Sequence, residues 1–92
     1  MIDFEWDNQK NKANIEKHSL PFELAKYVFE DANFQRFIDD KKEYNEVRYI
    51  GFGQLENNLF CVSYTIRKYK IRIISFRKAR QKELNKYLKK GV

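Results

Sequence analysis

Apolar residues recur at helical spacing in the first third of the chain, and the spacing changes to that of strands beyond its middle. Asp7 can cap a helix that runs to about His18, because its carboxylate accepts hydrogen bonds from the free N–H groups of a first turn. Pro21 suits a first helical position, so a second helix is predicted over residues 21–30. The apolar residues of that helix are Phe22, Ala25, Val28 and Phe29.

Three later segments, residues 47–53, 59–65 and 69–76, are rich in Val, Ile, Tyr and Phe, which favour pleated strands. Asn57-Asn58 and Arg67-Lys68 lie between these segments and predict hairpin turns. The three strands should therefore form an antiparallel meander.

The remaining elements complete an α+β pattern. Short strands are expected at residues 1–5 and 33–38, with a charged loop at residues 39–45. A last helix is predicted from about Ser75 to Lys90, with Gly91 as its stop. Its apolar stripe would be Ala79, Leu84, Tyr87 and Leu88. Two helices, then strands, then one helix indicate an α+β fold with helices packed on an antiparallel sheet.

Length and composition describe a small protein that stays inside the cell. The 92 residues suffice for one domain, 1–92, and 8 Phe, 6 Tyr and 1 Trp can close its core. No apolar stretch approaches the roughly 18 residues that cross a bilayer. The N-terminus is acidic where a signal peptide is basic and then apolar, so we expect a cytoplasmic protein without a membrane partner. The lone Cys61 agrees, because one thiol cannot build a disulfide framework.

Charge is distributed unevenly between the two halves. Residues 1–46 carry 11 acidic and 7 basic side chains, whereas residues 47–92 carry 2 acidic and 12 basic ones. Such asymmetry indicates a polyanionic partner, meaning a nucleic acid, a membrane surface or an acidic protein. The acidic half can also fold against the basic half and cancel part of its field.

The basic side chains are densest in the last predicted strand and at the start of the last helix. Strict alternation puts two cations of that strand on one face. That face holds Lys70, Arg72 and Ile74, and the other holds Ile71, Ile73 and Ser75. The full cluster is Arg67, Lys68, Lys70, Arg72, Arg77, Lys78, Arg80 and Lys82.

Arginine is suited to phosphate because its planar fork of donors matches two oxygens at once. Three aromatic residues lie among the cations and can stack on unpaired bases. They are Tyr64, Tyr69 and Phe76. The alternative is a well-solvated basic face with no special ligand.

Two residues near this cluster can be read in two ways. Glu83 shares a helix face with Arg80, and it is either a proton-handling carboxylate beside phosphate-binding arginines or one end of a salt bridge. From the residues alone we expect the salt bridge, to Arg80 or Lys86. His18 has an ordinary pKa of about 6.5, which suits acid–base catalysis. A lone histidine at a helix end is otherwise a packing or dipole partner.

The sequence lacks the residue patterns of a zinc site and of a phosphate-binding loop. One His and one Cys, far apart, cannot form a zinc site, and Asp39-Asp40 is expected to be a solvated turn. The segment Gly51-Phe52-Gly53 lacks the third glycine and the Lys–Ser/Thr pair of a phosphate-binding loop. We therefore expect no metal and no cofactor.

Ordered motifs cover nearly the whole chain. The first part is Phe4-Glu5-Trp6-Asp7, Lys10-Asn11, Asn14, Lys17-His18, Phe22-Glu23, Ala25, Val28-Phe29 and Asp31. The later part is Arg48, Ile50-Gly51, Tyr64-Thr65, Arg67, Ile71-Arg72-Ile73-Ile74-Ser75, Arg77, Ala79 and Arg80. In this order the motifs resemble the family of BrnT-type toxins. The chain departs from the usual pattern at Phe76 and Lys78, where Ala and Arg are common, and at Ile66, where an acid is frequent.

The resemblance implies a RelE-like fold and a ribonuclease toxin of a type II toxin–antitoxin pair, with RNA as its substrate. It also implies a heteromeric complex with a cognate DNA-binding antitoxin, BrnA-like, that occludes the toxin. Carried over by position, the candidate residues are Arg67, Arg72, Arg77, Arg80, Glu83 and Tyr64. The residue pattern itself adds Lys70 and Lys78 as RNA-binding candidates and His18 as a proton-handling one.

The resulting hypothesis is a metal-independent endoribonuclease that inhibits translation. Arg77 and Arg80 would stabilise the phosphate, and Arg67 and Arg72 would hold the RNA track, all converging on one scissile linkage. Glu83, Tyr64 and His18 remain open as proton-handling residues. The alternative is a non-catalytic nucleic-acid-binding or partner-docking module, which would use the same cations.

Overall fold

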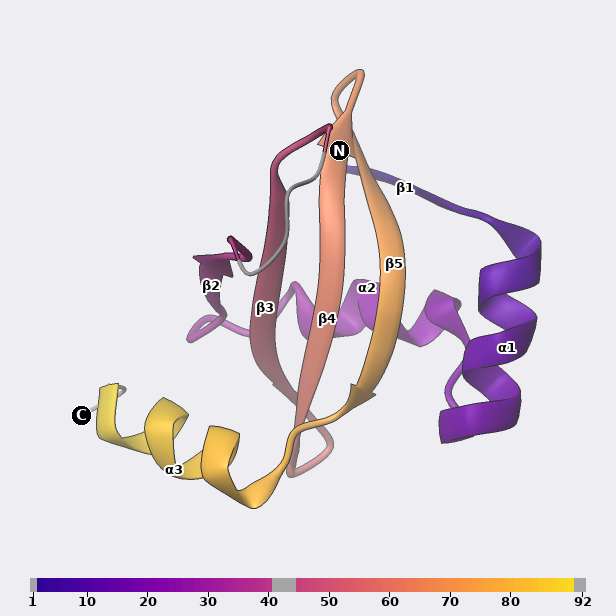
Figure 1. The fold of residues 1–92 in the computed structure, drawn as a ribbon. Coiled ribbons are helices and arrows are strands. Elements are labelled where there is room, and N and C mark those ends of the chain that lie inside the picture. Colours follow the sequence, from indigo (N-terminus) through magenta and orange to yellow (C-terminus); the bar gives the residue numbers. More distant parts are fainter. Residues whose placement is uncertain (1, 41–44, 91–92) are drawn as a thin grey trace.

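The protein is built on a five-stranded mixed sheet, with α2 behind it, α1 beside β5 and α3 leaving the end of β5 (Figure 1). The computed structural model describes residues 2–40 and 45–90, the last three by backbone alone. In chain order the elements are β1 (Asp3–Trp6), α1 (Asn8–His18), the 3₁₀ turn η1 (Phe22–Leu24), α2 (Ala25–Val28), β2 (Gln35–Ile38), β3 (Arg48–Leu55), β4 (Asn58–Arg67), β5 (Lys70–Lys78) and α3 (Gln81–Lys90). Within these residues, no helix is both long and apolar enough to cross a membrane.

The strands lie in the order β1-β5-β4-β3-β2. The predicted meander is confirmed, because β3 pairs antiparallel with β4 and β4 pairs antiparallel with β5. The strand β2 also pairs antiparallel with β3. The α+β class is also confirmed. A fully antiparallel sheet is wrong, since β1 pairs parallel with β5. β1 and β2 lie at opposite edges of the sheet, and the chain passes from one to the other through α1, η1 and α2.

Both hairpin turns lie one residue away from their predicted places. Glu56 and Asn57 have φ values of 50° and 69°, and Lys68 and Tyr69 have φ values of 48° and 68°. Two successive residues with positive φ form the tight turn whose twist matches that of paired strands. Because Asn58 and Arg67 already belong to strand ladders, neither is a central turn residue.

The first two helical segments follow their predicted signals with one correction. Asp7 caps α1 by accepting hydrogen bonds from the N–H groups of Gln9 and Lys10, at 2.7 and 3.2 Å. The predicted helix over residues 21–30 is shorter, namely η1 followed by the single turn of α2. Pro21 is the extended residue before η1, with ψ of 144°, and not its first helical residue.

The core lies between α2 with η1 and one face of the sheet. Its fully or nearly fully buried members are Phe22, Ala25, Val28, Phe60, Val62, Tyr64, Ile73 and Phe76. Gly53 allows the close approach of α2, because a Cβ there would lie 2.5 Å from the carbonyl oxygen of Val28, and Gly51 leaves room for the ring of Phe34. The two glycines of this segment therefore serve packing.

The last helix starts later than predicted. The sequence placed its beginning near Ser75, but β5 continues to Lys78, which pairs with Phe60. The N–H of Ala79 still donates to the carbonyl of Leu59, at 2.9 Å, so Ala79 precedes the helix. Of the predicted apolar stripe, Leu84 and Tyr87 face the protein, whereas the side chain of Leu88 and the stop at Gly91 lie outside the described residues. Most of the predicted loop at residues 39–45 also lies outside them.

Asn14 attaches α1 to the part of β5 that β1 leaves unpaired. Its amide nitrogen donates to the carbonyls of Phe76 and Leu20, at 2.7 and 2.8 Å, and its amide oxygen accepts from the N–H of Phe76 at 3.1 Å. The side chain thus substitutes for a neighbouring strand at one residue of the sheet edge. Because this residue is only 7% exposed, water cannot replace these bonds.

The substitution Asn14→Leu should lower the free energy of unfolding by about 2–4 kcal/mol, since it leaves buried backbone groups of Phe76 without partners. Urea denaturation followed by circular dichroism measures this loss. Lys12→Ala, at an exposed position of the same helix, should change the stability by less than about 0.5 kcal/mol. Equal stability of the two variants would show that the Asn14 bridge is unimportant.

Candidate active site

A β-bulge in β5 decides which side chains lie on the sheet face opposite α2, here called the open face. Tyr64 pairs with Ile73 while Ser63 pairs with Ser75, so Ile74 is an extra residue in β5. The predicted alternation of side chains therefore holds up to Ile73 and is wrong beyond it. As a result Arg72 and Arg77, five positions apart, both lie on the open face, opposite Thr65 and Cys61 of β4. Phe76 keeps its place in the core.

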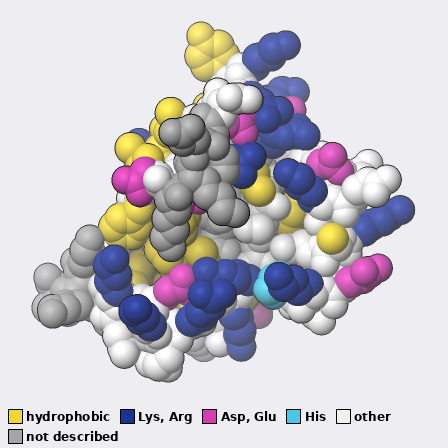
Figure 2. Space-filling view, viewed as in Figure 1, with side chains coloured by type: hydrophobic (Ala, Val, Ile, Leu, Met, Phe, Trp, Pro, Cys, Tyr) yellow, Lys and Arg dark blue, Asp and Glu magenta, His cyan; other side chains and the backbone are white. Residues whose placement is uncertain are grey.

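Basic side chains occupy two zones of the open face (Figure 2). Arg67, Lys70 and Arg72 lie near the β4–β5 turn and form what is here called the upper zone. Arg77 lies near the other end of β5, in what is here called the lower zone. The β4 partners of Arg72 and Arg77, Thr65 and Cys61, are four positions apart, so at about 3.3 Å per strand residue the two arginines are roughly 13 Å apart along the strand. The arginines therefore line one face but do not converge on one point, in contrast to the expectation from the sequence.

The upper zone is partly neutralised by the acidic half of the chain. Glu46 forms ion pairs with Arg67 at 2.7 Å and with Arg48 at 3.5 Å, and Glu5 forms one with Arg72 at 3.3 Å. The hydrogen bond from Arg67 lowers the pKa of Glu46. The acidic half does fold against the basic half, as the charge distribution allowed.

The lower zone is organised by Glu83. Arg77 donates two parallel hydrogen bonds to its carboxylate, both 2.8 Å long, and the backbone N–H of Arg80 donates a third at 2.8 Å. The third bond is half of a capping box, in which a carboxylate in the first turn satisfies the N–H that precedes the helix. The expected salt bridge exists, but its partner is Arg77 of β5 and not Arg80 or Lys86.

These contacts keep Glu83 ionised. The hydrogen bonds from Arg77, helped by the N–H of Arg80, lower the pKa of Glu83 to about 2 in spite of its partial burial. The same pair raises the pKa of Arg77. Near neutral pH, Glu83 is thus a weak base whose main effect is to hold Arg77 and the start of α3.

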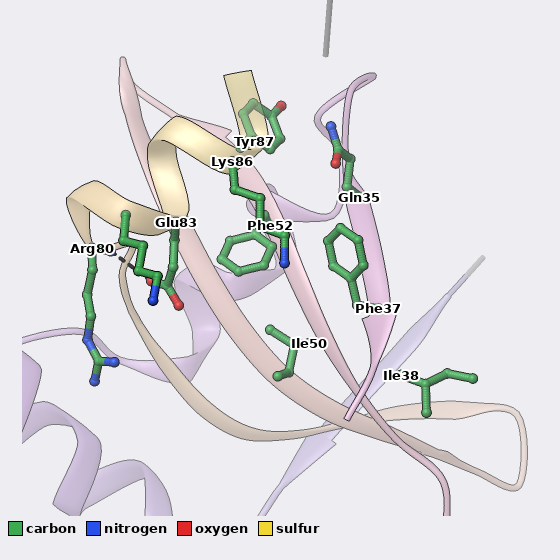
Figure 3. Close-up of a pocket in the computed structure, with 10 residues that line it drawn as sticks. Gln35, Phe37, Ile38, Ile50, Phe52, Arg80, Glu83, Lys86 and Tyr87 are labelled. Carbon is green, nitrogen blue, oxygen red and sulfur yellow. Dashed lines mark hydrogen bonds between the residues drawn. The ribbon is translucent and has the colours of Figure 1, made fainter. Parts of the chain in front are cut away.

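Arg80 follows β5 and lies directly before α3. It is exposed and forms no ion pair with any residue that the structure describes. Its guanidinium extends from the start of the helix beside Glu83 (Figure 3). Because the backbone N–H of Arg80 and the guanidinium of Arg77 share the carboxylate of Glu83, the exposed side chain of Arg80 starts close to the fixed one of Arg77, and two such arginines are suited to a phosphate group.

His18 ends α1 on the same side of the molecule. The only histidine of the sequence, cyan in Figure 2, lies beside dark blue basic side chains of the lower zone. Partial burial lowers its pKa, and the charges of Lys17 and Arg77 lower it further. The imidazole is therefore neutral at pH 7 and able to accept a proton.

Two predicted site residues are not part of this surface. Tyr64 lies in the core on the opposite face of the sheet, is 2% exposed and stacks on Tyr49 with ring centroids 5.3 Å apart. Burial raises its pKa. Lys78 pairs with Phe60, so it also belongs to the opposite face, although it is exposed. Because of the bulge, Arg77 and not Lys78 shares the face of Arg72.

The structure also shows a pocket that sequence reasoning missed. It has a volume of about 450 Å³ and lies between α3 and the outer strands of the open face (Figure 3). Its lining is Gln35, Phe37, Ile38, Ile50, Phe52, Arg80, Lys82, Glu83, Lys86 and Tyr87. A signal was present, because apolar side chains lie on both faces of residues 49–55, Ile50 and Phe52 on one and Tyr49 and Leu55 on the other, which is typical of a strand covered on both sides.

Comparison with known protein families identifies the family of the chain. Residues 6–83 match the family model described as "Ribonuclease toxin, BrnT, of type II toxin-antitoxin system". The chain belongs to the BrnT family. None of the curated proteins matches it. The matched residues include His18, the cationic open face and the Arg77–Glu83 pair, so this BrnT toxin has its candidate site inside the family region.

Membership also states the kind of activity. The family consists of ribonuclease toxins of type II toxin–antitoxin systems, which implies that this BrnT chain has an antitoxin partner. The resemblance inferred from the ordered motifs is thereby confirmed at the level of the family.

Glu83→Gln should cost this BrnT protein about 2–3 kcal/mol of stability at pH 7, because the pKa of Glu83 falls from 4.5 to about 2 on folding. A lowered carboxyl pKa stabilises the fold above pH 4.5, and this contribution disappears as the pH falls from 4.5 towards 2. Urea denaturation at pH 7, 4 and 2 should show that the difference in the free energy of unfolding between the variant and the wild type shrinks as the pH falls. Glu16→Gln, an exposed change in α1, is the control. A constant gap at every pH would contradict the ion pair.

Proposed function

We propose that this BrnT toxin is a metal-independent endoribonuclease that cuts RNA in the cytoplasm and thereby inhibits translation. We further propose that the 92 residues act as one RelE-like domain. The observation that supports the activity most strongly is the lower zone, where the guanidinium of Arg77 and the backbone N–H of Arg80 bind the same carboxylate of Glu83, and where the exposed side chain of Arg80 forms no ion pair with a described residue. This zone lies at the end of a cationic sheet face that can hold a polyanion.

RNA supplies its own nucleophile, which limits what the protein must provide. The 2′-oxygen attacks the adjacent phosphorus while the bond from phosphorus to the 5′-oxygen breaks. The products are a 2′,3′-cyclic phosphate and a 5′-hydroxyl. Negative charge grows on the non-bridging oxygens in the transition state, and Arg77 and Arg80 stabilise it electrostatically. Glu83 positions Arg77 through two hydrogen bonds, which fixes the direction of its remaining donors.

Proton transfer is assigned to His18. Glu83, with a pKa of about 2, is too weak a base near neutral pH, and the hydroxyl of Tyr64 lies on the buried face. The neutral imidazole of His18 can accept the proton of the 2′-hydroxyl. The 5′-oxygen takes up a proton as it leaves, and the resulting imidazolium is a suitable donor.

The upper zone binds the RNA away from the cut. Arg67, Lys70 and Arg72 lie along β4 and β5 on the same face as Arg77, so a single strand can cross the sheet and reach the lower zone. We propose that a BrnA-like, DNA-binding antitoxin covers this face in the complex. A partner with an acidic surface would exchange its carboxylates for RNA phosphates on the same cations.

Cleavage should persist in excess chelator and leave 2′,3′-cyclic phosphate ends. The test incubates purified toxin with single-stranded RNA and EDTA and identifies the ends by mass spectrometry. Arg77→Ala and Arg80→Ala should each lower the cleavage rate at least about 10²-fold, because each removes a donor from the developing charge. Both variants should also relieve growth arrest.

The matched control for these variants is Arg36→Ala. Arg36 is an exposed arginine that packs over the ring of Tyr49 on the opposite sheet face, with its Cζ 5.2 Å from the ring centroid. Its removal should leave the cleavage rate within about twofold of the wild type. Salt-sensitive RNA binding without cleavage in any buffer would instead identify a non-catalytic binding module.

The cleavage rate should rise with pH, with a midpoint below 6.5, because the neutral form of His18 is the base and its pKa is lowered. His18→Gln should lower the rate about 10²-fold and remove this rise. Lys17→Gln should keep the activity and move the midpoint upward, since the charge of Lys17 helps to lower the pKa. A wild-type profile retained in His18→Gln would assign the proton transfer to another group.

A further inference from the structure

The pocket under α3 has an aromatic wall. Phe37 of β2 and Phe52 of β3 stand on the sheet side with their ring centroids 6.1 Å apart, and Ile50 lies beside them (Figure 3). The three side chains are half-buried, so part of their apolar surface is exposed in the pocket and can contact a ligand. Tyr87 closes the helix side, and its position is fixed because its hydroxyl proton is shared between the carboxylate of Asp31 and the carbonyl of Asn33.

The rim of the pocket is cationic. Arg80, Lys82 and Lys86 line it from α3 and the residue before it, and the Nζ of Lys86 lies 5.9 Å from the ring centroid of Phe37. Among the described residues, Glu83 is the only acidic one that lines the pocket, and its charge is already paired with Arg77. A ligand of this pocket therefore combines a flat apolar body with negative charge at its edge.

We infer that the pocket binds one unpaired nucleobase of the RNA, next to the scissile phosphate. The base lies against the Phe52 side of the sheet wall, and its phosphates meet the cations of the rim. Arg80 and Glu83 line the pocket and also belong to the lower zone, so the base site and the phosphate site are continuous. The amide of Gln35, which offers both a donor and an acceptor, stands at the pocket and can read the edge of the base (Figure 3).

This inference rests on the proposed function, since it names the part of the RNA that the site recognises. An acidic peptide would also satisfy the cationic rim. The wall of Phe37 and Phe52 favours a base, because a planar base can stack on an aromatic ring while its phosphate binds the neighbouring cations.

The test measures binding and not cleavage. Fluorescence anisotropy compares a short 2′-O-methyl RNA, which lacks the free nucleophile, with the same backbone made abasic throughout. The wild type should bind the base-bearing strand about tenfold more tightly than the abasic one. Phe52→Leu, which keeps apolar bulk but removes the ring, should weaken binding of the base-bearing strand about fivefold and leave the abasic strand unchanged.

Phe37→Leu is the second variant, in case Phe52→Leu does not fold by circular dichroism. Tyr27→Leu is the matched control, because Tyr27 is an aromatic residue, 52% exposed, on α2 behind the sheet. The inference is overturned if the wild type binds the two strands equally, or if folded Phe52→Leu or Phe37→Leu binds the base-bearing strand as tightly as the wild type does, and either result would favour a peptide occupant. Because the probe cannot be cleaved, failure of the ribonuclease proposal leaves this result readable by itself.

Discussion

The arrangement of the site depends on one ion pair between the last strand and the last helix. Arg77 and Glu83 are joined by two hydrogen bonds of 2.8 Å, and Glu83 also accepts from the N–H of Arg80. The carboxylate thereby orients the guanidinium of Arg77 and caps α3 through the backbone N–H of Arg80. Partial burial strengthens this arrangement, because neither side chain of the pair is more than a quarter exposed and water screens their attraction weakly.

The sheet separates stability from function by its two faces. One face packs against α2 and η1, where Gly53 admits α2 closely and Gly51 leaves room for the ring of Phe34. The other face carries the basic side chains and the pocket. The bulge at Ile74 is what makes both faces possible along the whole of β5, because it lets Phe76 enter the core while Arg77 returns to the open face.

The arginines of the open face differ in whether carboxylates of the same chain already pair with them. Arg67 and Arg72 are paired with Glu46 and Glu5, so phosphates that bind there must compete with carboxylates of the same chain. Arg80 has no such competitor among the described residues. The cations near the β4–β5 turn are therefore less available to an added anion than Arg80 is.

Features that depend on neighbours in the chain were determined by the sequence itself. The Asp7 cap, the existence of most elements, the turns to within one residue and the basic cluster all follow from local patterns, and the ordered motifs indicated the family before any coordinates. Features that depend on pairing across the fold were decided only by the tertiary structure. A single inserted residue in β5 reverses the facing of every later side chain, so Lys78 and Arg77 exchange the faces that strict alternation assigns. The partner of Glu83, the burial of Tyr64 and the pocket at Phe52 likewise arise from contacts between strands and helices that are distant in sequence, and no local pattern specifies such contacts.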